Sequence, residues 1–250
     1  MIHSFLLIGQ SNMAGRGFLN EAVPVDNTNV YVLRNGRFHH LFRPVHNDRS
    51  FSGVCLAESF AERYAKTYGV SVGLIPCADG GTALNQWMPG EILFDHAVAQ
   101  AKLAMRSSKI VGILWHQGEA DCGETLYPTY GARFEEMMAA FRKELDLPDV
   151  PFLVGGLGDF LAKCSLSDKL KNYSFVNEAL REIAAHHPRV GFVSAEGLGA
   201  NPDHLHFHAK ALHEFGLRYF EEFCRLMGEE IVPKIDTDAA EPIRTDMEML

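Results

Sequence analysis

Residues 5–16 read F-L-L-I-G-Q-S-N-M-A-G-R, and this stretch decides the fold. Its first part, residues 5–8, is a continuous apolar run, which is typical of a strand buried on both faces of a parallel sheet. The polar residues Gln10, Ser11 and Asn12 follow at the carboxyl end of that strand, where open α/β sheets place their ligands. Ser11 is therefore a candidate nucleophile, although serine and asparagine at this position also cap helices.

Strand-like and helix-like segments alternate along the rest of the chain. Further buried strands are expected at residues 70–77, 110–115, 151–156 and 190–194. Amphipathic helices are expected at residues 54–68, 92–106, 130–145, 170–185 and 209–226. Such alternation requires a mostly parallel sheet with right-handed crossovers and helices on both faces. The sequence therefore predicts a three-layer α/β/α sandwich around five strands.

The 250 residues are suited to one large domain, which we place at residues 1–227. Residues 17–53 are rich in Asn, Gly, Pro and His with one short strand-like piece at 29–34, and a loop this long tends to be functional. Residues 228–250 lose periodicity and gain charge and proline, so we expect an extended or partly disordered tail whose role the sequence leaves open.

Composition excludes several classes of partner. The formal net charge of −9 argues against nucleic acid and anionic membranes, which need a basic surface. No apolar run is long enough to span a bilayer, and the first residues lack the pattern of an export signal. Five dispersed cysteines without a C-x-x-C pair suggest neither a disulfide framework nor a zinc site. A cytoplasmic protein acting on a small neutral ligand is expected, with the oligomeric state left open.

Residues suited to acyl transfer follow the other predicted strands. Gly80, Gly81 and Thr82 come after the strand at 70–77, and the segment Q-G-E at 117–119 comes after the strand at 110–115. Near the C-terminus, Asp203 precedes His206 by three residues just before the last helix, so its carboxylate can orient the imidazole. Ester cleavage needs a nucleophile, an oriented base and donors for an oxyanion, and the chain offers all three.

Four blocks of the sequence together resemble one known family. They are G-Q-S-N-M-A-G-R-G at 9–17, I-P-C-A-D-G-G-T at 75–82, G-I-L-W-H-Q-G-E-A-D at 112–121 and D-H-L-H-F at 203–207. In this order they resemble the SGNH/GDSL hydrolases, in particular the carbohydrate acetylesterases related to acetylxylan esterases of carbohydrate esterase family 6 and to sialate O-acetylesterases. The match spans nearly the whole chain, and a helix cap at Ser11 alone explains none of the other blocks.

The resemblance implies a flavodoxin-like fold and a serine esterase that needs no cofactor. It implies Ser11 as nucleophile, His206 as base and Asp203 as its orienting partner. It also implies an oxyanion hole formed by the backbone N–H of Ser11, a backbone N–H at Gly80 or Gly81 and the side-chain amide of Gln117. Gly-Gln-Ser-Asn-Met replaces the Gly-Asp-Ser of many superfamily members, and Gln117 replaces an asparagine; both departures fit the acetylesterase branch.

Further residues are expected around this centre. Gln10, Asn12, Thr82, His116 and Glu119 are expected to support the site or to contact substrate, and Trp87 is a candidate platform for a sugar ring.

The substrate and two rival classes stay open. The substrate is expected to be an acetyl ester of a xylo-oligosaccharide or related sugar, with a sialate or another small ester as alternatives. Outside this class, a flavodoxin-like module that binds a sugar or phosphate without chemistry remains, as does a metal-dependent hydrolase built on the histidines of the H-x-H-x-H run at 204–208.

Overall fold

The computed structural model describes residues 1–228, and the predicted tail lies outside the described residues except for Gly228. One seven-stranded sheet organises this part of the chain, in the order β3-β2-β4-β1-β5-β6-β7. Its strands are β1 (Ile2–Gly9), β2 (Val30–Arg34), β3 (Arg37–His40), β4 (Val72–Pro76), β5 (Ser108–His116), β6 (Phe152–Gly155) and β7 (Val190–Val193). Every pairing is parallel except that of β2 with β3. The prediction of a mostly parallel α/β/α sandwich is confirmed.

The predicted strand number of five was too low. The five expected strands are present as β4-β1-β5-β6-β7, and β2, foreseen only as a strand-like piece of the long loop, extends the sheet beyond β4. No pattern predicts β3, because the strand has only four residues and only one of them, Phe38, is buried. This polar antiparallel strand closes the edge of the sheet next to β2.

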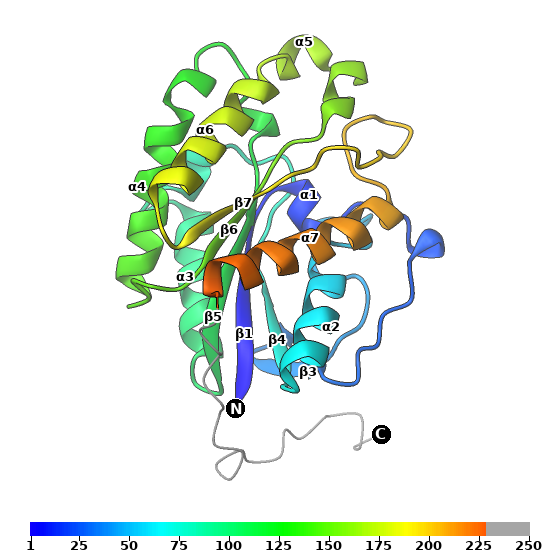
Figure 1. Ribbon diagram of the computed structural model, residues 1–250, viewed down its shortest axis with the longest axis vertical. Helices are drawn as coiled ribbons and strands as arrows, with labels where there is room; N and C mark the ends of the chain where they lie inside the picture. The colour runs from blue at the N-terminus through cyan, green and yellow to red at the C-terminus, as the bar shows by residue number, and fades with distance from the viewer. Residues whose placement is uncertain (229–250) are drawn as a thin grey trace.

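Helices cover both faces of the sheet (Figure 1). The longer ones are α2 (Ala57–Tyr68), α3 (Ile92–Ala104), α4 (Tyr130–Glu144), α6 (Tyr173–His186) and α7 (Ala209–Met227). Shorter turns are α1 (Ser11–Ala14), α5 (Ser167–Leu170) and the 3-10 helices η1 (Leu19–Glu21), η2 (Leu84–Trp87), η3 (Glu119–Asp121), η4 (Tyr127–Thr129) and η5 (Asp159–Lys163). Helices α2 and α7 pack together on one face, whereas α3, α4 and α6 cover the other.

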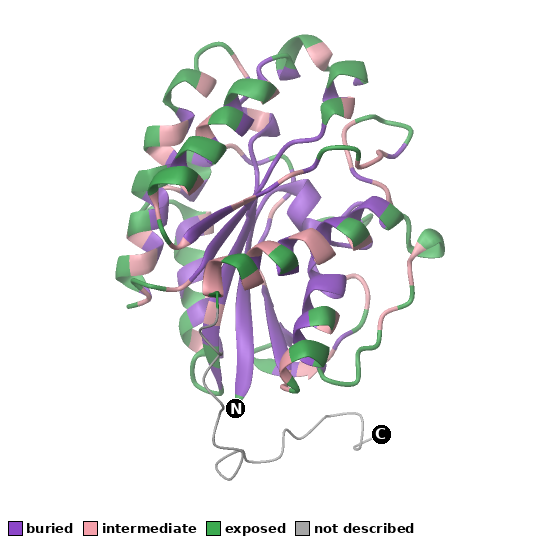
Figure 2. Ribbon diagram, viewed as in Figure 1, coloured by how far each residue is buried: buried purple, intermediate pink, exposed green. Residues whose placement is uncertain are grey.

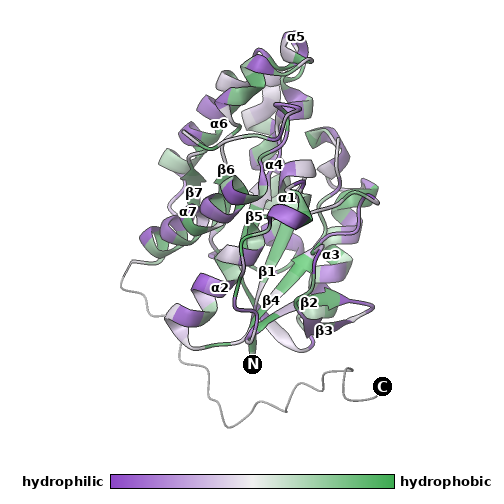
Figure 3. Cartoon of the chain, turned by 90° about the vertical axis from the view of Figure 1, so that its right-hand side faces the viewer, coloured by the Kyte–Doolittle hydropathy of each residue, from purple (hydrophilic) through white to green (hydrophobic). Residues whose placement is uncertain are grey.

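Strand β1 lies in the middle of the sheet and is buried along its whole length (Figures 1 and 2). Alternate side chains serve opposite faces, so Phe5 packs under α2 and α7 while Leu6 packs under α3. The ring of Phe5 meets those of Phe60, Tyr64 and Phe223 at centroid distances of 4.7, 4.9 and 5.8 Å. The central strands are correspondingly apolar (Figure 3), which explains the continuous run seen in the sequence.

The order of the strands reverses on either side of β1, which places a crevice at the carboxyl ends of β4, β1 and β5. The ends of β1 and β5 approach closely, since a Cβ atom on Gly9 would lie 2.1 Å from the carbonyl oxygen of His116. Gly9 also has φ of +127°, so glycine is required there on both counts. Among the described residues, no helix is both long and apolar enough to cross a bilayer.

Candidate active site

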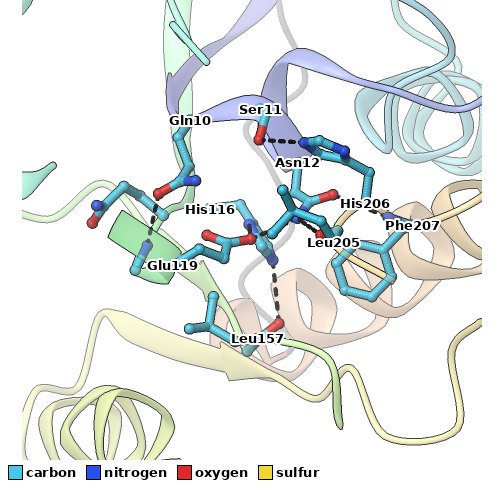
Figure 4. A network of polar contacts seen from close by, with 12 residues as sticks. Gln10, Ser11, Asn12, His116, Glu119, Leu157, Leu205, His206 and Phe207 are labelled. Carbon is cyan, nitrogen blue, oxygen red and sulfur yellow. Dashed lines mark hydrogen bonds and ion pairs between the residues drawn. The ribbon is translucent and has the colours of Figure 1, made fainter. Parts of the chain in front are cut away.

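Ser11 and His206 meet at the carboxyl edge of the sheet (Figure 4), and Asp203 is bonded to His206. Ser11 opens α1 directly after β1, and His206 lies in the loop before α7. The Nε2 atom of His206 lies 3.0 Å from Ser11 Oγ, and its Nδ1 atom lies 2.7 Å from an Asp203 carboxylate oxygen. An ionised carboxylate only accepts hydrogen bonds, so this arrangement leaves Nε2 free to accept the proton of the serine hydroxyl.

The Asp203 carboxylate is held by its own turn. Its second oxygen accepts the backbone N–H groups of Leu205 at 2.9 Å and His206 at 3.0 Å. Partial burial acts to raise the pKa of Asp203, but these donors and the imidazole of His206 outweigh it and the pKa lies below its ordinary value. Asp203 is therefore ionised at neutral pH and fixes the orientation of the ring.

Asn12 clamps the loop that carries His206. Its amide nitrogen donates to the carbonyl oxygen of Leu205 at 3.2 Å, and its amide oxygen accepts the N–H of Phe207 at 3.1 Å. The same nitrogen donates to the carboxylate of Glu119. Glu119 therefore holds the side chain of Asn12 in place.

His116 lies buried beneath the site and does not line it. The side chain is completely buried, its Nε2 lies 3.2 Å from the carbonyl oxygen of Gly156, and its ring packs edge-on against Phe207 and Phe215. Burial lowers the pKa of His116, so the ring is neutral. His116 belongs to the layer beneath the loop of His206.

Backbone N–H groups near Ser11 are available to a negative charge. The N–H groups of Ser11 and Asn12 begin α1 and bond to no other group within residues 1–228, as the first turn of a helix dictates.

Of the two candidate glycines, Gly80 is already engaged, because its N–H donates to Asp48 at 2.9 Å. Gly81 is exposed with φ of +79°, and its N–H has no partner in the described chain. The choice left open in the sequence therefore favours Gly81.

Gln117 does not present a free donor to the site, which corrects the role that the resemblance implied. The side chain is completely buried, and its amide nitrogen donates to Thr82 O at 3.0 Å and to Asp121 Oδ2 at 2.7 Å. Its amide oxygen lies 3.3 Å from the hydroxyl of Tyr130, which donates to it. One amide proton thus ties Gln117 to the loop after β4, and the other is bonded to Asp121 in η3.

Gln10 has the free amide nitrogen that Gln117 lacks. Its amide oxygen accepts the N–H groups of Gly118 and Ala120, each at 3.4 Å, which fixes the orientation of the amide. The nitrogen bonds to no group of residues 1–228, and Figure 4 shows it turned toward the side of Ser11. From the sequence, Gln10 was expected only to support the site or to contact substrate.

A buried ion pair that the sequence did not reveal lies behind Ser11. Arg16 donates to both oxygens of Asp48, at 3.2 and 2.6 Å, and the two side chains are 5% and 3% exposed. Asp48 also accepts from Ser52 Oγ at 2.7 Å. Burial acts to raise the pKa of Asp48, but the hydrogen bonds from Arg16 and Ser52 outweigh it and keep the pKa below its ordinary value.

This ion pair explains the glycine at position 80. A Cβ atom there would lie 2.4 Å from Arg16 Nη2 and 2.9 Å from Asp48 Oδ2. Asp48 comes from the long segment at 17–53, so this segment reaches the site. No local pattern in the sequence predicts that Asp48 pairs with Arg16.

Trp87 is not a sugar platform, which corrects the expectation. It is completely buried in η2, where its indole packs edge-on against Trp115 at 5.6 Å and donates to Thr82 Oγ1 at 3.0 Å. Thr82 is itself buried, and its hydroxyl donates to Asp79 O at 2.8 Å. Both residues hold the loop after β4 and are out of reach of a ligand.

The histidines beside His206 do not form a metal site. His208 caps α7 through its Nδ1, which accepts the N–H of Ala211 at 2.9 Å, and His204 is exposed in a turn with φ of +49°. Within residues 1–228, no three His, Cys, Asp or Glu side chains are grouped to hold a metal ion.

The cysteines near the site are unsuited to act as nucleophiles. Burial raises the pKa of both Cys77 and Cys122, so neither forms a thiolate at neutral pH.

A cavity of about 590 Å³ opens beside His206 and Asp203. Its remaining wall consists of residues 16–20, residues 50–53 and Asn201. The cavity is large enough for a small ligand of the size of a sugar.

The sheet order and the crevice at its carboxyl edge define the fold of the protein, that of the SGNH hydrolases. The chain belongs to the carbohydrate esterase family described as sialic acid-specific acetylesterase, whose family model matches residues 1–225. Members of this family hydrolyse acetyl esters of carbohydrates, so the predicted superfamily and its acetylesterase branch are both confirmed.

Individual relatives agree with this placement. The chain is 28% identical to the probable carbohydrate esterase At4g34215 of Arabidopsis thaliana, over 88% of this chain and 91% of the relative. The crystal structure of that protein superposes with a TM-score of 0.80 at 26% identity, covering 89% of this chain and 98% of the other. The carbohydrate acetylesterase XAC1771 of Xanthomonas citri, at 18% identity and a TM-score of 0.67 over 90% of this chain and 56% of the other, shares the fold.

Proposed function

We propose that the protein is a serine esterase that removes O-acetyl groups from a small sugar, such as an acetylated xylo-oligosaccharide, through an acetyl-serine intermediate. The observation that carries this proposal is the hydrogen-bonded chain from Ser11 Oγ through His206 to Asp203, with contacts of 3.0 and 2.7 Å. A hydroxyl in contact with an imidazole that a carboxylate orients is the arrangement that makes serine nucleophilic.

In the first half of the reaction, His206 Nε2 takes the hydroxyl proton of Ser11 while Oγ bonds to the acetyl carbonyl carbon. The oxyanion is held by the N–H groups of Ser11 and Gly81 and by the side-chain nitrogen of Gln10. The bond from carbon to the sugar oxygen then breaks, and His206 returns its proton to the departing alcohol.

In the second half, water attacks the acetyl-serine. His206 takes a proton from the water, acetate leaves, and the proton returns to Ser11 Oγ. No group other than the residues named is required for this cycle.

The decisive experiment compares the protein with Ser11→Ala on p-nitrophenyl acetate and on peracetylated xylose, with and without EDTA. The proposal expects the parent protein to release acetate from both esters regardless of EDTA and the variant to be inactive. A serine-directed phosphonate should inactivate the parent and add its mass to Ser11 alone. Retained activity in Ser11→Ala, or loss of activity with EDTA, would remove the serine mechanism.

The compartment is part of the proposal as well. All five cysteines are free thiols, and four of them are buried. Reduced thiols suit a cytoplasmic enzyme that acts on a small acetylated sugar after its uptake.

A further inference from the structure

The wall of the 590 Å³ cavity next to His206 carries three exposed apolar side chains. Phe18, Leu19 and Phe51 are 46%, 49% and 67% exposed. All three line the cavity together with Asp203 and His206, so they face the space next to the imidazole that contacts Ser11. Exposed apolar groups that gather at a cavity mark a surface that a ligand covers.

The ring of Phe51 contacts the protein on one of its sides, through Arg16. The guanidinium carbon of Arg16 lies 5.3 Å from the centre of its ring, as in a cation–π contact. Arg16 is itself 5% exposed, so this side of the ring is shielded, while the high exposure of Phe51 leaves the rest of the ring open. A partly fixed aromatic ring loses little conformational freedom when a ligand stacks on it.

The charges of the cavity wall are already compensated. Arg16 is the only cationic Lys or Arg side chain in the lining within residues 1–228, and Asp48 neutralises it. The carboxylate in the lining, Asp203, is bonded to His206. A carboxylate on the ligand would therefore find no cation to pair with, whereas the apolar face of an uncharged pyranose matches the open phenylalanine ring.

We infer that Phe51, flanked by Phe18 and Leu19, forms the subsite for the sugar ring of the acetyl ester. The apolar face of an uncharged pyranose stacks on Phe51 while one of its acetyl groups reaches Ser11. This subsite takes the place that Trp87 was expected to fill. The inference rests on the proposed esterase function and assigns the residues that select the alcohol part of the substrate.

The test compares Phe51→Ala with a matched control on two uncharged esters. Methyl tri-O-acetyl-β-xylopyranoside presents a pyranose, and ethyl acetate has no ring. We expect Phe51→Ala to lower kcat/KM for the xyloside about tenfold, the size of a lost stacking contact, and to leave ethyl acetate within about twofold. The control Phe175→Ala removes another exposed phenylalanine, 51% exposed on α6 and outside the cavity, and should change neither rate.

Two further measurements sharpen the result. Phe51→Trp should keep the rate on the xyloside, because indole offers a larger stacking surface. The parent protein should prefer the xyloside to 9-O-acetyl-N-acetylneuraminic acid. Equal losses on both esters in Phe51→Ala, no loss on either, or a preference for the sialate overturns the subsite. A parent protein that hydrolyses neither ester instead overturns the proposed function itself.

Discussion

The side chain of Asn12 bonds to the peptide groups on both sides of His206, through Leu205 O at 3.2 Å and Phe207 N at 3.1 Å. The residue next to Ser11 in the sequence thus holds the loop of His206, 194 residues further along the chain. The distance of 3.0 Å between Ser11 and His206 depends on this clamp as much as on either residue.

Asn12→Ala should lower kcat about 10- to 100-fold with little change in KM, because the loop of His206 loses its fixed distance to Ser11. Steady-state kinetics on p-nitrophenyl acetate measures this effect. The phosphonate should still label Ser11 in the variant, only more slowly. An unchanged kcat would show that the loop holds His206 without Asn12.

Asp203→Asn keeps the shape of the side chain but removes the charge that orients His206 and stabilises its protonated form. We expect kcat to fall at least about 100-fold, while the thermal unfolding midpoint changes little because the amide oxygen still accepts the N–H groups of Leu205 and His206. Asp159→Asn, a change at η5, serves as the control for removing a carboxylate. A loss below about threefold would exclude Asp203 from its role.

The two glutamines should respond differently. Gln10→Ala removes a donor that has no other partner, so kcat should fall about 10²- to 10³-fold with a nearly unchanged unfolding midpoint. Gln117→Ala removes the donor to the buried carbonyl of Thr82 and one of the donors to Asp121, and should destabilise the fold by about 1–3 kcal/mol. Activity assays and thermal denaturation of both variants separate the two roles. A stable Gln117→Ala protein with the larger loss of kcat would return the donor role to Gln117.

Asp48→Ala should strongly destabilise the protein, because it leaves the Arg16 guanidinium buried and unpaired. Breaking a buried pair from one side costs about 3–5 kcal/mol, which urea denaturation can measure. Replacing both partners, as in Arg16→Met with Asp48→Leu, should recover much of that loss. If the double variant is no more stable than Asp48→Ala, the ion pair is not the source of the effect.

Stability should fall as pH decreases from about 6.5 toward 4. Burial lowers the pKa of His46 to about 3 and that of His3 to about 4, so both are neutral in the folded protein. The unfolded chain binds protons at these residues below about pH 6.5, hence protonation favours unfolding in this window. For His46 the loss at pH 5 is about 2 kcal/mol. Urea denaturation at pH 7.5 and pH 5 measures it, and His46→Gln should reduce the difference between the two pH values.

The proximity of Ser11, His206 and Asp203 could be predicted because each lies in a short motif next to a strand or helix end, and parallel strands bring such ends to one edge. The sandwich was predictable for a similar reason, since its parallel strands are buried on both faces and read as apolar runs. The short, polar strand β3 shows no apolar run, because only one of its four residues is buried.

The direction in which each side chain of the site points could not be predicted from the sequence. Gln10 and Gln117 both follow apolar strands, and only the three-dimensional contacts show that one amide nitrogen is free and the other is used. Trp87 follows a glycine-rich turn, yet η2 turns its indole inward against Trp115. The pair of Arg16 with Asp48 depends on how a long loop folds back, which no local pattern specifies.

The separation of Ser11 from His206 along the chain also bears on how the protein is made. The ribosome adds Ser11 directly after β1 and His206 only after β7, so a nascent chain can complete the seven strands of the sheet before it contains His206. Helix α7 packs against α2, β6 and β7, and its docking brings the preceding loop onto Asn12. The contact between Ser11 and His206 therefore depends on the docking of α7, the last helix of the described chain.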